Sequence, residues 1–80
     1  MSASAYVLIN VQVNRVRKVY EELMKIKEIT LIDAISGPFD IIVSLTAPDF
    51  NTLGKIVIDK IQSIPGVERT LTCQVIRFEP

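Results

Sequence analysis

The sequence has 80 residues, enough for one small domain, and its 49% hydrophobic content can build a core without disulfides, although so short a chain is marginal alone. Nine basic and nine acidic side chains cancel, which excludes a global field that would draw the chain onto nucleic acid or an anionic membrane. No histidine is present as general base or metal ligand, and no apolar run approaches the roughly 20 residues that span a bilayer, so we expect a cytoplasmic protein without a cofactor.

The N-terminal part of the chain predicts a strand followed by an amphipathic helix. Residues 6–13 alternate in the way typical of a strand with one buried face. One face carries Val7, Ile9, Val11 and Val13, and the other carries Tyr6, Leu8, Asn10 and Gln12. From residue 15 to about residue 27 apolar side chains recur every three or four positions, which predicts a helix capped by Asn14. Its apolar stripe is Val16, Val19, Tyr20, Leu23 and Ile26.

The middle of the chain predicts a β-hairpin. Two runs rich in aliphatic and β-branched residues, 29–35 and 41–46, flank the loop Ser36-Gly37-Pro38-Phe39-Asp40. Gly37 can take a positive φ, and Pro38 fixes its own φ near the turn value. The loop therefore folds the two runs back antiparallel, and it presents an aromatic ring beside a carboxylate.

The C-terminal part predicts a second helix and a last strand. Ala47-Pro48 ends the third strand, and Asp49 is placed either as the N-cap of the helix or just before the N-cap. The stripe of this helix is Phe50, Leu53, Ile56, Val57, Ile61 and Ile64, and Pro65-Gly66 ends it. Residues 67–78 form the last strand, with Leu71, Cys73 and Val75 on one side and Thr70, Thr72, Gln74 and Ile76 on the other. Cys73 is expected to be a small buried hydrophobe.

The order of these elements is βαββαβ in a single domain, residues 1–80. Right-handed crossovers place both helices on one face of a four-stranded antiparallel sheet, which is the ferredoxin-like α+β fold. We expect Val7, Ile9, Val11, Leu71, Cys73 and Val75 under the helices, and Tyr6, Leu8, Asn10, Gln12, Asp33, Thr70, Thr72 and Gln74 on the open face. That face predicts a dimeric α+β barrel, with two sheets packed face to face; the alternative is a monomer with a solvated sheet face.

Two stretches carry a resemblance to a known family. Ser36-Gly37-Pro38-Phe39-Asp40 resembles the G-x-[YF]-D loop of the RAM domain, the effector-binding and oligomerising module of Lrp/AsnC-type transcription regulators. Residues 64–72, Ile-Pro-Gly-Val-Glu-Arg-Thr-Leu-Thr, are similar to that family's I-P-G-V-x-x-T-x-T signature. Such regulators carry an N-terminal helix-turn-helix domain, whereas here the first strand begins almost at the first residue. The sequence thus resembles a stand-alone RAM module.

The resemblance implies a sheet-to-sheet dimer, a ring of dimers, and a small effector such as an amino acid bound near the glycine loop. The effector site it implies consists of Gly37, Phe39 and Asp40 in the loop and Thr70 and Thr72 on the facing strand. Asp40 would pair with the ammonium, while loop amides and threonine hydroxyls would bind the carboxylate. Asp40 could instead cap turn amides, the threonines could simply suit a strand, and Phe39 could fill an interface. Phe39 replaces the family's commoner tyrosine, so any contact through that hydroxyl is absent.

The function predicted is a non-catalytic oligomeric regulatory module that binds an amino acid and modulates transcription through full-length Lrp/AsnC-type partners, without binding DNA itself. One alternative is a cofactor-independent enzyme of the dimeric α+β barrel type. The lack of histidine, tryptophan and a closely spaced carboxylate pair opposes it. Another is an ACT-like regulatory domain, which shares the topology and the ligand class. The two signatures together favour the RAM domain.

Overall fold

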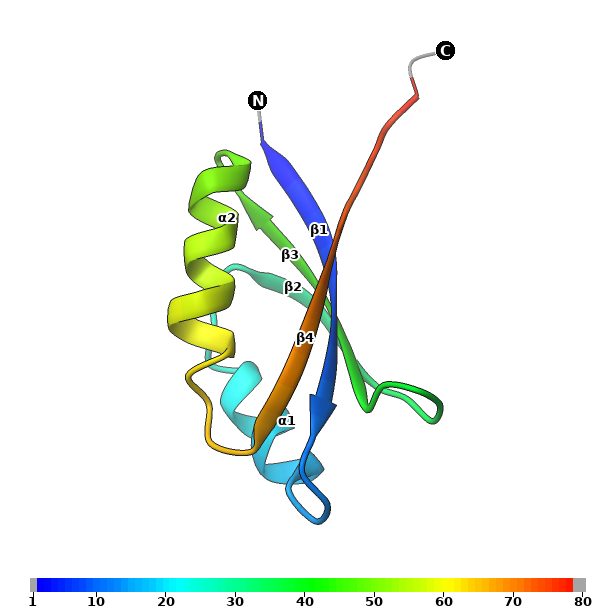
Figure 1. The fold of residues 1–80 in the computed structure, drawn as a ribbon. Coiled ribbons are helices and arrows are strands. Elements are labelled where there is room, and N and C mark those ends of the chain that lie inside the picture. Colours follow the sequence, from blue (N-terminus) through cyan, green and yellow to red (C-terminus); the bar gives the residue numbers. More distant parts are fainter. Residues whose placement is uncertain (1, 79–80) are drawn as a thin grey trace.

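A computed structural model describes residues 2–78 and arranges them as one antiparallel sheet with two helices on one of its faces (Figure 1). The elements are β1 (Ala3–Val11), α1 (Val16–Leu23), β2 (Ile29–Ala34), β3 (Ile41–Ala47), α2 (Phe50–Ile56), its π-helical continuation η1 (Val57–Ile61), and β4 (Val67–Gln74). The four strands lie in the order β2-β3-β1-β4. The predicted βαββαβ order and ferredoxin-like topology are confirmed. Within residues 2–78, no helix has the length and hydrophobicity needed to cross a membrane.

The central strand β1 begins earlier and ends earlier than the alternation of residues 6–13 predicts. Ala3 and Ala5 are buried and pair with Ala47 and Leu45 of β3, because a small side chain fits where the sheet passes under α2. The strand ends at Val11, and Val13, which was expected on the buried face, is 87% exposed.

The turn between β1 and α1 also differs from its prediction. Asn14 has φ +68° and does not cap the helix. Asparagine tolerates this left-handed conformation better than most residues, so it serves the turn. Arg15 occupies the cap position without a side-chain hydrogen bond.

One hydrophobic core fills the space between the helices and the sheet. Every second residue of β1 and β3 points into it, as do the apolar stripes of α1, α2 and η1. The fully buried large side chains are Val7, Ile9, Val19, Leu23, Ile41, Val43, Leu45, Leu53 and Ile61. Phe50 was predicted to belong to the apolar stripe, but it lies outside this core. It is in the first turn of α2 and is 41% exposed.

The start and the end of the long second helix are held by specific contacts. The backbone N–H of Thr52 donates to Oδ1 of Asp49 over 2.7 Å, so Asp49 is the N-cap, which is one of its two expected placements. This hydrogen bond lowers the pKa of the Asp49 carboxyl. Near the other end, Nζ of Lys60 lies 3.1 Å from the Glu28 carboxylate, just before β2, and this hydrogen bond lowers the pKa of Glu28. The chain leaves through Gly66, whose φ is +103°.

The side chains of β4 point to the opposite faces of the sheet from those predicted. Leu71 pairs with Leu8 and Cys73 with Tyr6. Directly opposed residues of antiparallel strands point to the same face, so Leu71 and exposed Cys73 lie on the uncovered side of the sheet. Thr70 and Thr72 pair with Ile9 and Val7 and therefore lie on the helix side. In agreement, Nε2 of Gln62, which follows η1, donates to Oγ1 of Thr70 over 2.9 Å.

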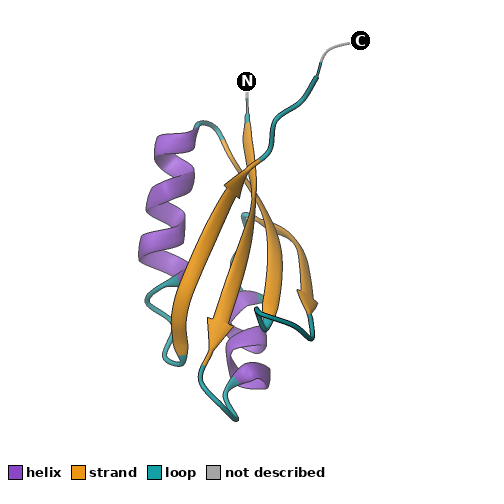
Figure 2. Cartoon of the chain, turned by 45° about the vertical axis from the view of Figure 1, so that its right-hand side comes forward, coloured by secondary structure: helices purple, strands orange, loops and turns teal. Residues whose placement is uncertain are grey.

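The physical reason for this error is that alternation along a strand identifies an apolar face but not the side of the sheet to which that face belongs. Figure 2 shows that one side of the sheet carries no helix. With the observed register, apolar side chains point to that side. We call it the open sheet face, and its apolar members are Tyr6, Leu8, Leu31, Ile42, Leu71 and Cys73. Leu71 at 49% and Tyr6 at 46% exposure give it an apolar character unusual for a solvated sheet.

Candidate functional site

The hairpin loop between β2 and β3 stands at one end of the sheet and is tied to the central strand. The backbone N–H of Ile35 donates to the Asp40 carbonyl oxygen over 2.8 Å, which closes the loop. The backbone N–H of Asp40 donates to the Ile9 carbonyl oxygen over 2.9 Å. Gly37 has φ +154°, a value that side-chain-bearing residues rarely adopt, so the glycine is required for this loop shape. The predicted hairpin is confirmed.

The carboxylate of Asp40 reaches across to β1 instead of capping its own turn. Its Oδ2 accepts a hydrogen bond of 2.8 Å from the backbone N–H of Val11, the last residue of that strand. Asp40 is half-buried, and within residues 2–78 its Oδ1 accepts no hydrogen bond. Oδ2 is therefore held in place, while Oδ1 can still accept a hydrogen bond from a ligand.

Asn10 connects the hairpin loop to β4. Its Nδ2 donates to the Pro38 carbonyl oxygen over 2.7 Å, and its Oδ1 accepts from Nη2 of Arg69 over 3.2 Å. The guanidinium carbon of Arg69 lies 6.0 Å from the centre of the Phe39 ring, within the range of a cation–π contact. Asn10 and Phe39 together orient the arginine, and its remaining N–H groups donate no hydrogen bond within residues 2–78.

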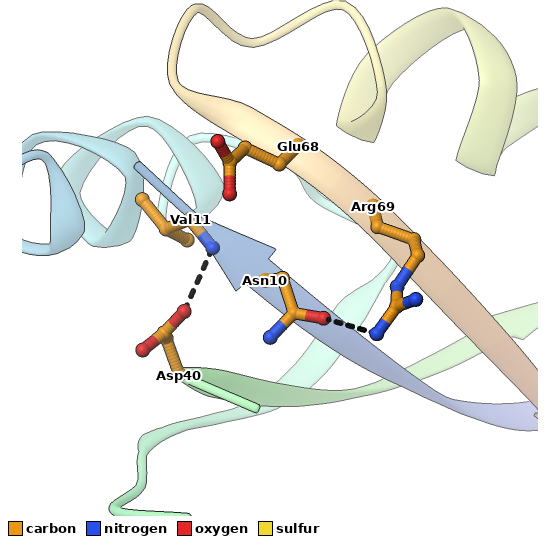
Figure 3. A pocket seen from close by; sticks show the side chains of 5 residues that line it. All are labelled: Asn10, Val11, Asp40, Glu68 and Arg69. Atoms are coloured by element: carbon orange, nitrogen blue, oxygen red, sulfur yellow. Dashed lines mark hydrogen bonds between the residues drawn. The ribbon is translucent and has the colours of Figure 1, made fainter. Parts of the chain in front are cut away.

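A β-bulge in β4 adds a second carboxylate to this group. Asn10 pairs with Arg69 and the next residue, Val11, pairs with Val67, so Glu68 is an extra residue outside the ladder. Neighbours on a regular strand point to opposite faces, yet Glu68 and Arg69 both line the same cavity. This cavity has a volume of about 450 Å³ and is bounded by Asn10, Val11, Asp40, Glu68 and Arg69 (Figure 3).

The cavity therefore presents opposite charges at separate places. Figure 3 shows the carboxylates of Asp40 and Glu68 on the Val11 side of Asn10 and the guanidinium of Arg69 on the other side. A carboxylate binds an ammonium group, and a guanidinium binds a carboxylate with charge-assisted hydrogen bonds. The volume of the cavity lies within the range usual for small-molecule sites. The arrangement suits a small molecule that carries both charges.

The structure assembles only part of the predicted effector site. Asp40 lines this cavity, Phe39 lies against Arg69 of its lining, and Gly37 shapes the loop that carries both. Thr72 lies on the helix side of the sheet, and Thr70 lines a neighbouring hollow of about 380 Å³ together with Gln62. The ligand roles of these residues stay predictions.

Sequence reasoning missed the roles of Asn10, Glu68 and Arg69. Glu68 and Arg69 occupy the two variable positions of the I-P-G-V-x-x-T-x-T signature, so the motif gave them no role. Asn10 was expected on the open face but not beside the loop. Within residues 2–78, no group of three or more histidine, cysteine, aspartate or glutamate side chains is placed to hold a metal ion.

Comparison with known proteins places this geometry in context. Residues 4–78 match the family described as the Lrp/AsnC ligand binding domain. An uncharacterised HTH-type transcriptional regulator of Pyrococcus abyssi is 31% identical over 68 residues, which cover 85% of this chain and 43% of that protein. The matched segment thus spans less than half the length of this curated relative.

Two solved structures show the same architecture. The crystal structure of TTHA0845 from Thermus thermophilus superposes with a TM-score of 0.89 at 31% identity, covering 98% of both chains. A transcriptional regulator from Neisseria meningitidis, whose structure is a complex with L-Met, superposes with a TM-score of 0.84 at 19% identity over 94% of this chain and 50% of the regulator. The latter likeness concerns the fold alone.

Proposed function

The chain belongs to the Lrp/AsnC ligand-binding domain family, and we therefore propose that it is a non-catalytic regulatory module that binds a free amino acid in the cavity beside its hairpin loop. The observation that carries this proposal is that a carboxylate, Asp40, and a guanidinium, Arg69, line one cavity of about 450 Å³. An α-amino acid carries an ammonium and a carboxylate on one carbon, so it offers one group to each of these two charges. Family membership also separates the chain from the ACT-like alternative.

The proposed ligand geometry follows from the hydrogen bonds already present. The ammonium binds Oδ1 of Asp40, because Oδ2 is engaged by Val11. The carboxylate binds the free N–H groups of Arg69, which Asn10 holds in position. This differs from the sequence-based expectation, in which threonine hydroxyls bind the carboxylate.

Asp40→Asn is expected to weaken amino-acid binding by about 1.5–3 kcal/mol, because the amide keeps the shape but loses the charge that pairs with the ammonium. Folding should change little, since the asparagine oxygen still accepts the Val11 N–H. A thermal-shift screen of the common amino acids selects the ligand. Calorimetric titration with that ligand then compares wild type, Asp40→Asn and the control Asp59→Asn, whose side chain is exposed on η1. Equal affinities for all three proteins would remove Asp40 from the ligand site.

Self-association belongs to the same proposal. The open sheet face supplies the surface for a homodimer with its two sheets packed together, and such dimers can assemble further into a ring. The support is the exposed apolar character of Tyr6, Leu31 and Leu71, which a monomer of this size would leave in water. The effector site borders this face, because Asn10 follows Leu8 by two positions on β1 and points to the same side.

We further propose that the module acts through larger Lrp/AsnC-type partners in the cytoplasm. Purified chain is expected to show no binding to duplex DNA in mobility-shift assays at physiological salt. The formal net charge is zero, and within residues 2–78 the helices are separated by strands instead of forming a helix-turn-helix. A full-length HTH-type regulator of the family is the positive control. Salt-sensitive, sequence-preferring retardation by the chain alone would contradict this part of the proposal.

A further inference from the structure

Given the proposed amino-acid site, we infer that its effector is a basic amino acid whose side-chain cation is bound by Glu68. The inference rests on that proposed function and adds the class of side chain that the cavity selects. Three charged groups line the cavity, namely Asp40, Glu68 and Arg69, so the lining carries one more negative than positive charge. The whole chain has zero formal net charge, so this excess is a local property of the site.

The charge excess decides between classes of amino acid. A zwitterion with a neutral side chain pairs its ammonium with Asp40 and its carboxylate with Arg69, and it leaves Glu68 without a counter-ion. A ligand with a second cation neutralises all three groups. Placing a positive charge beside two neighbouring carboxylates also relieves their mutual repulsion, whereas an acidic side chain would add to it. Lysine and arginine therefore match the lining, and neutral or acidic amino acids match it less well.

The backbone supports this role for Glu68. In an unbroken ladder Glu68 would point away from the face that carries Arg69, and the bulge is what brings both side chains to the cavity. Unlike the side chains of Asp40 and Arg69, the side chain of Glu68 forms no hydrogen bond or ion pair within residues 2–78. Its exposed carboxylate is thus the one charged group of the lining without a structural task, and it is free to bind a ligand side chain.

The test uses pairs of amino acids that differ in side-chain charge and little else. L-lysine is compared with L-norleucine, and L-arginine with L-citrulline, by calorimetric titration of the full chain. We expect each basic amino acid to bind about tenfold more tightly than its neutral counterpart. Glu68→Gln should weaken lysine binding roughly threefold to tenfold and leave norleucine binding unchanged. The control Glu21→Gln removes an exposed carboxylate from α1 and should leave both affinities as in wild type.

The outcomes separate this inference from the function on which it rests. The inference is supported if wild type binds lysine more tightly than norleucine and this ratio of affinities falls in Glu68→Gln but not in Glu21→Gln. Norleucine or another neutral amino acid binding as tightly as lysine overturns the inference and leaves the amino-acid site standing. A lysine preference of the same size in Glu68→Gln as in wild type also overturns the role of Glu68. Failure of every amino acid to bind wild type overturns both proposals. Circular dichroism of each variant confirms that the comparison concerns folded protein.

Discussion

Leu8→Glu is expected to convert the proposed dimer into monomers. Leu8 lies near the middle of the open sheet face, between Leu71 of β4 and Ile42 of β3. When two such faces pack together, the new carboxylate would be buried against apolar side chains with no partner to offset its lost hydration. The penalty for burying an unpaired charge exceeds what a small interface contributes, so the dimer should not form.

Light scattering measures this result directly. Wild type should scatter as a multiple of the 9.0 kDa chain, and Leu8→Glu should scatter as a single chain. Leu8 is half-buried even in one protomer, so Leu71→Glu, on the exposed part of edge strand β4, provides a second variant that can dissociate without unfolding. Asn51→Glu adds the same charge to an exposed position of α2 and should leave the particle size unchanged. A wild-type particle of one chain at every concentration would contradict the dimer.

Ile9→Ala is expected to lower the free energy of unfolding by about 2–5 kcal/mol, which is a large part of the stability of a small domain. Ile9 is fully buried on the helix side of the central strand. Removing most of its side chain leaves a cavity that neighbouring strands cannot close. The Ile9 carbonyl oxygen also accepts the Asp40 N–H, so loosening this strand should weaken ligand binding as well.

The matched control for this change is Ile58→Ala, the same substitution at a position that is 61% exposed on η1. It should alter the free energy of unfolding by no more than about 0.5 kcal/mol. Denaturant titrations of both variants are compared with wild type at one fixed protomer concentration, because association contributes to apparent stability. Similar losses for the two variants would contradict the position of the core described here.

The sequence predicted those parts of the fold that local patterns determine. The stripe of α2 and η1 apart from Phe50, the place of Asp49 at its start and the end of the helix before Gly66 were recognisable, because each depends on residues within one or two turns. The phase of β4 was not predictable in the same way. Its alternation is clear, but the face it joins depends on pairing with β1 and on the bulge at Glu68, and neither leaves a local signal.

The candidate site divides along the same line. Gly37, Phe39 and Asp40 are neighbours in the sequence, and the resemblance of their motif drew attention to them. The partners of that loop come from far away: Asn10 and Arg69 are 59 positions apart and meet only because β1 and β4 are adjacent in the sheet. A contact of this kind is a property of the register, so it could be found only in three dimensions.

The bulge at Glu68 has a consequence for how such a module can diversify. Because Glu68 pairs with no residue of β1 and is exposed, its side chain contributes little to the core or to the sheet. Most substitutions there should therefore be nearly neutral for folding while changing the charge that the cavity offers. Under the proposal for Glu68, recognition and stability are carried by different residues of one short strand. Position 68 is accordingly a natural starting point for engineering sensors that respond to other small molecules.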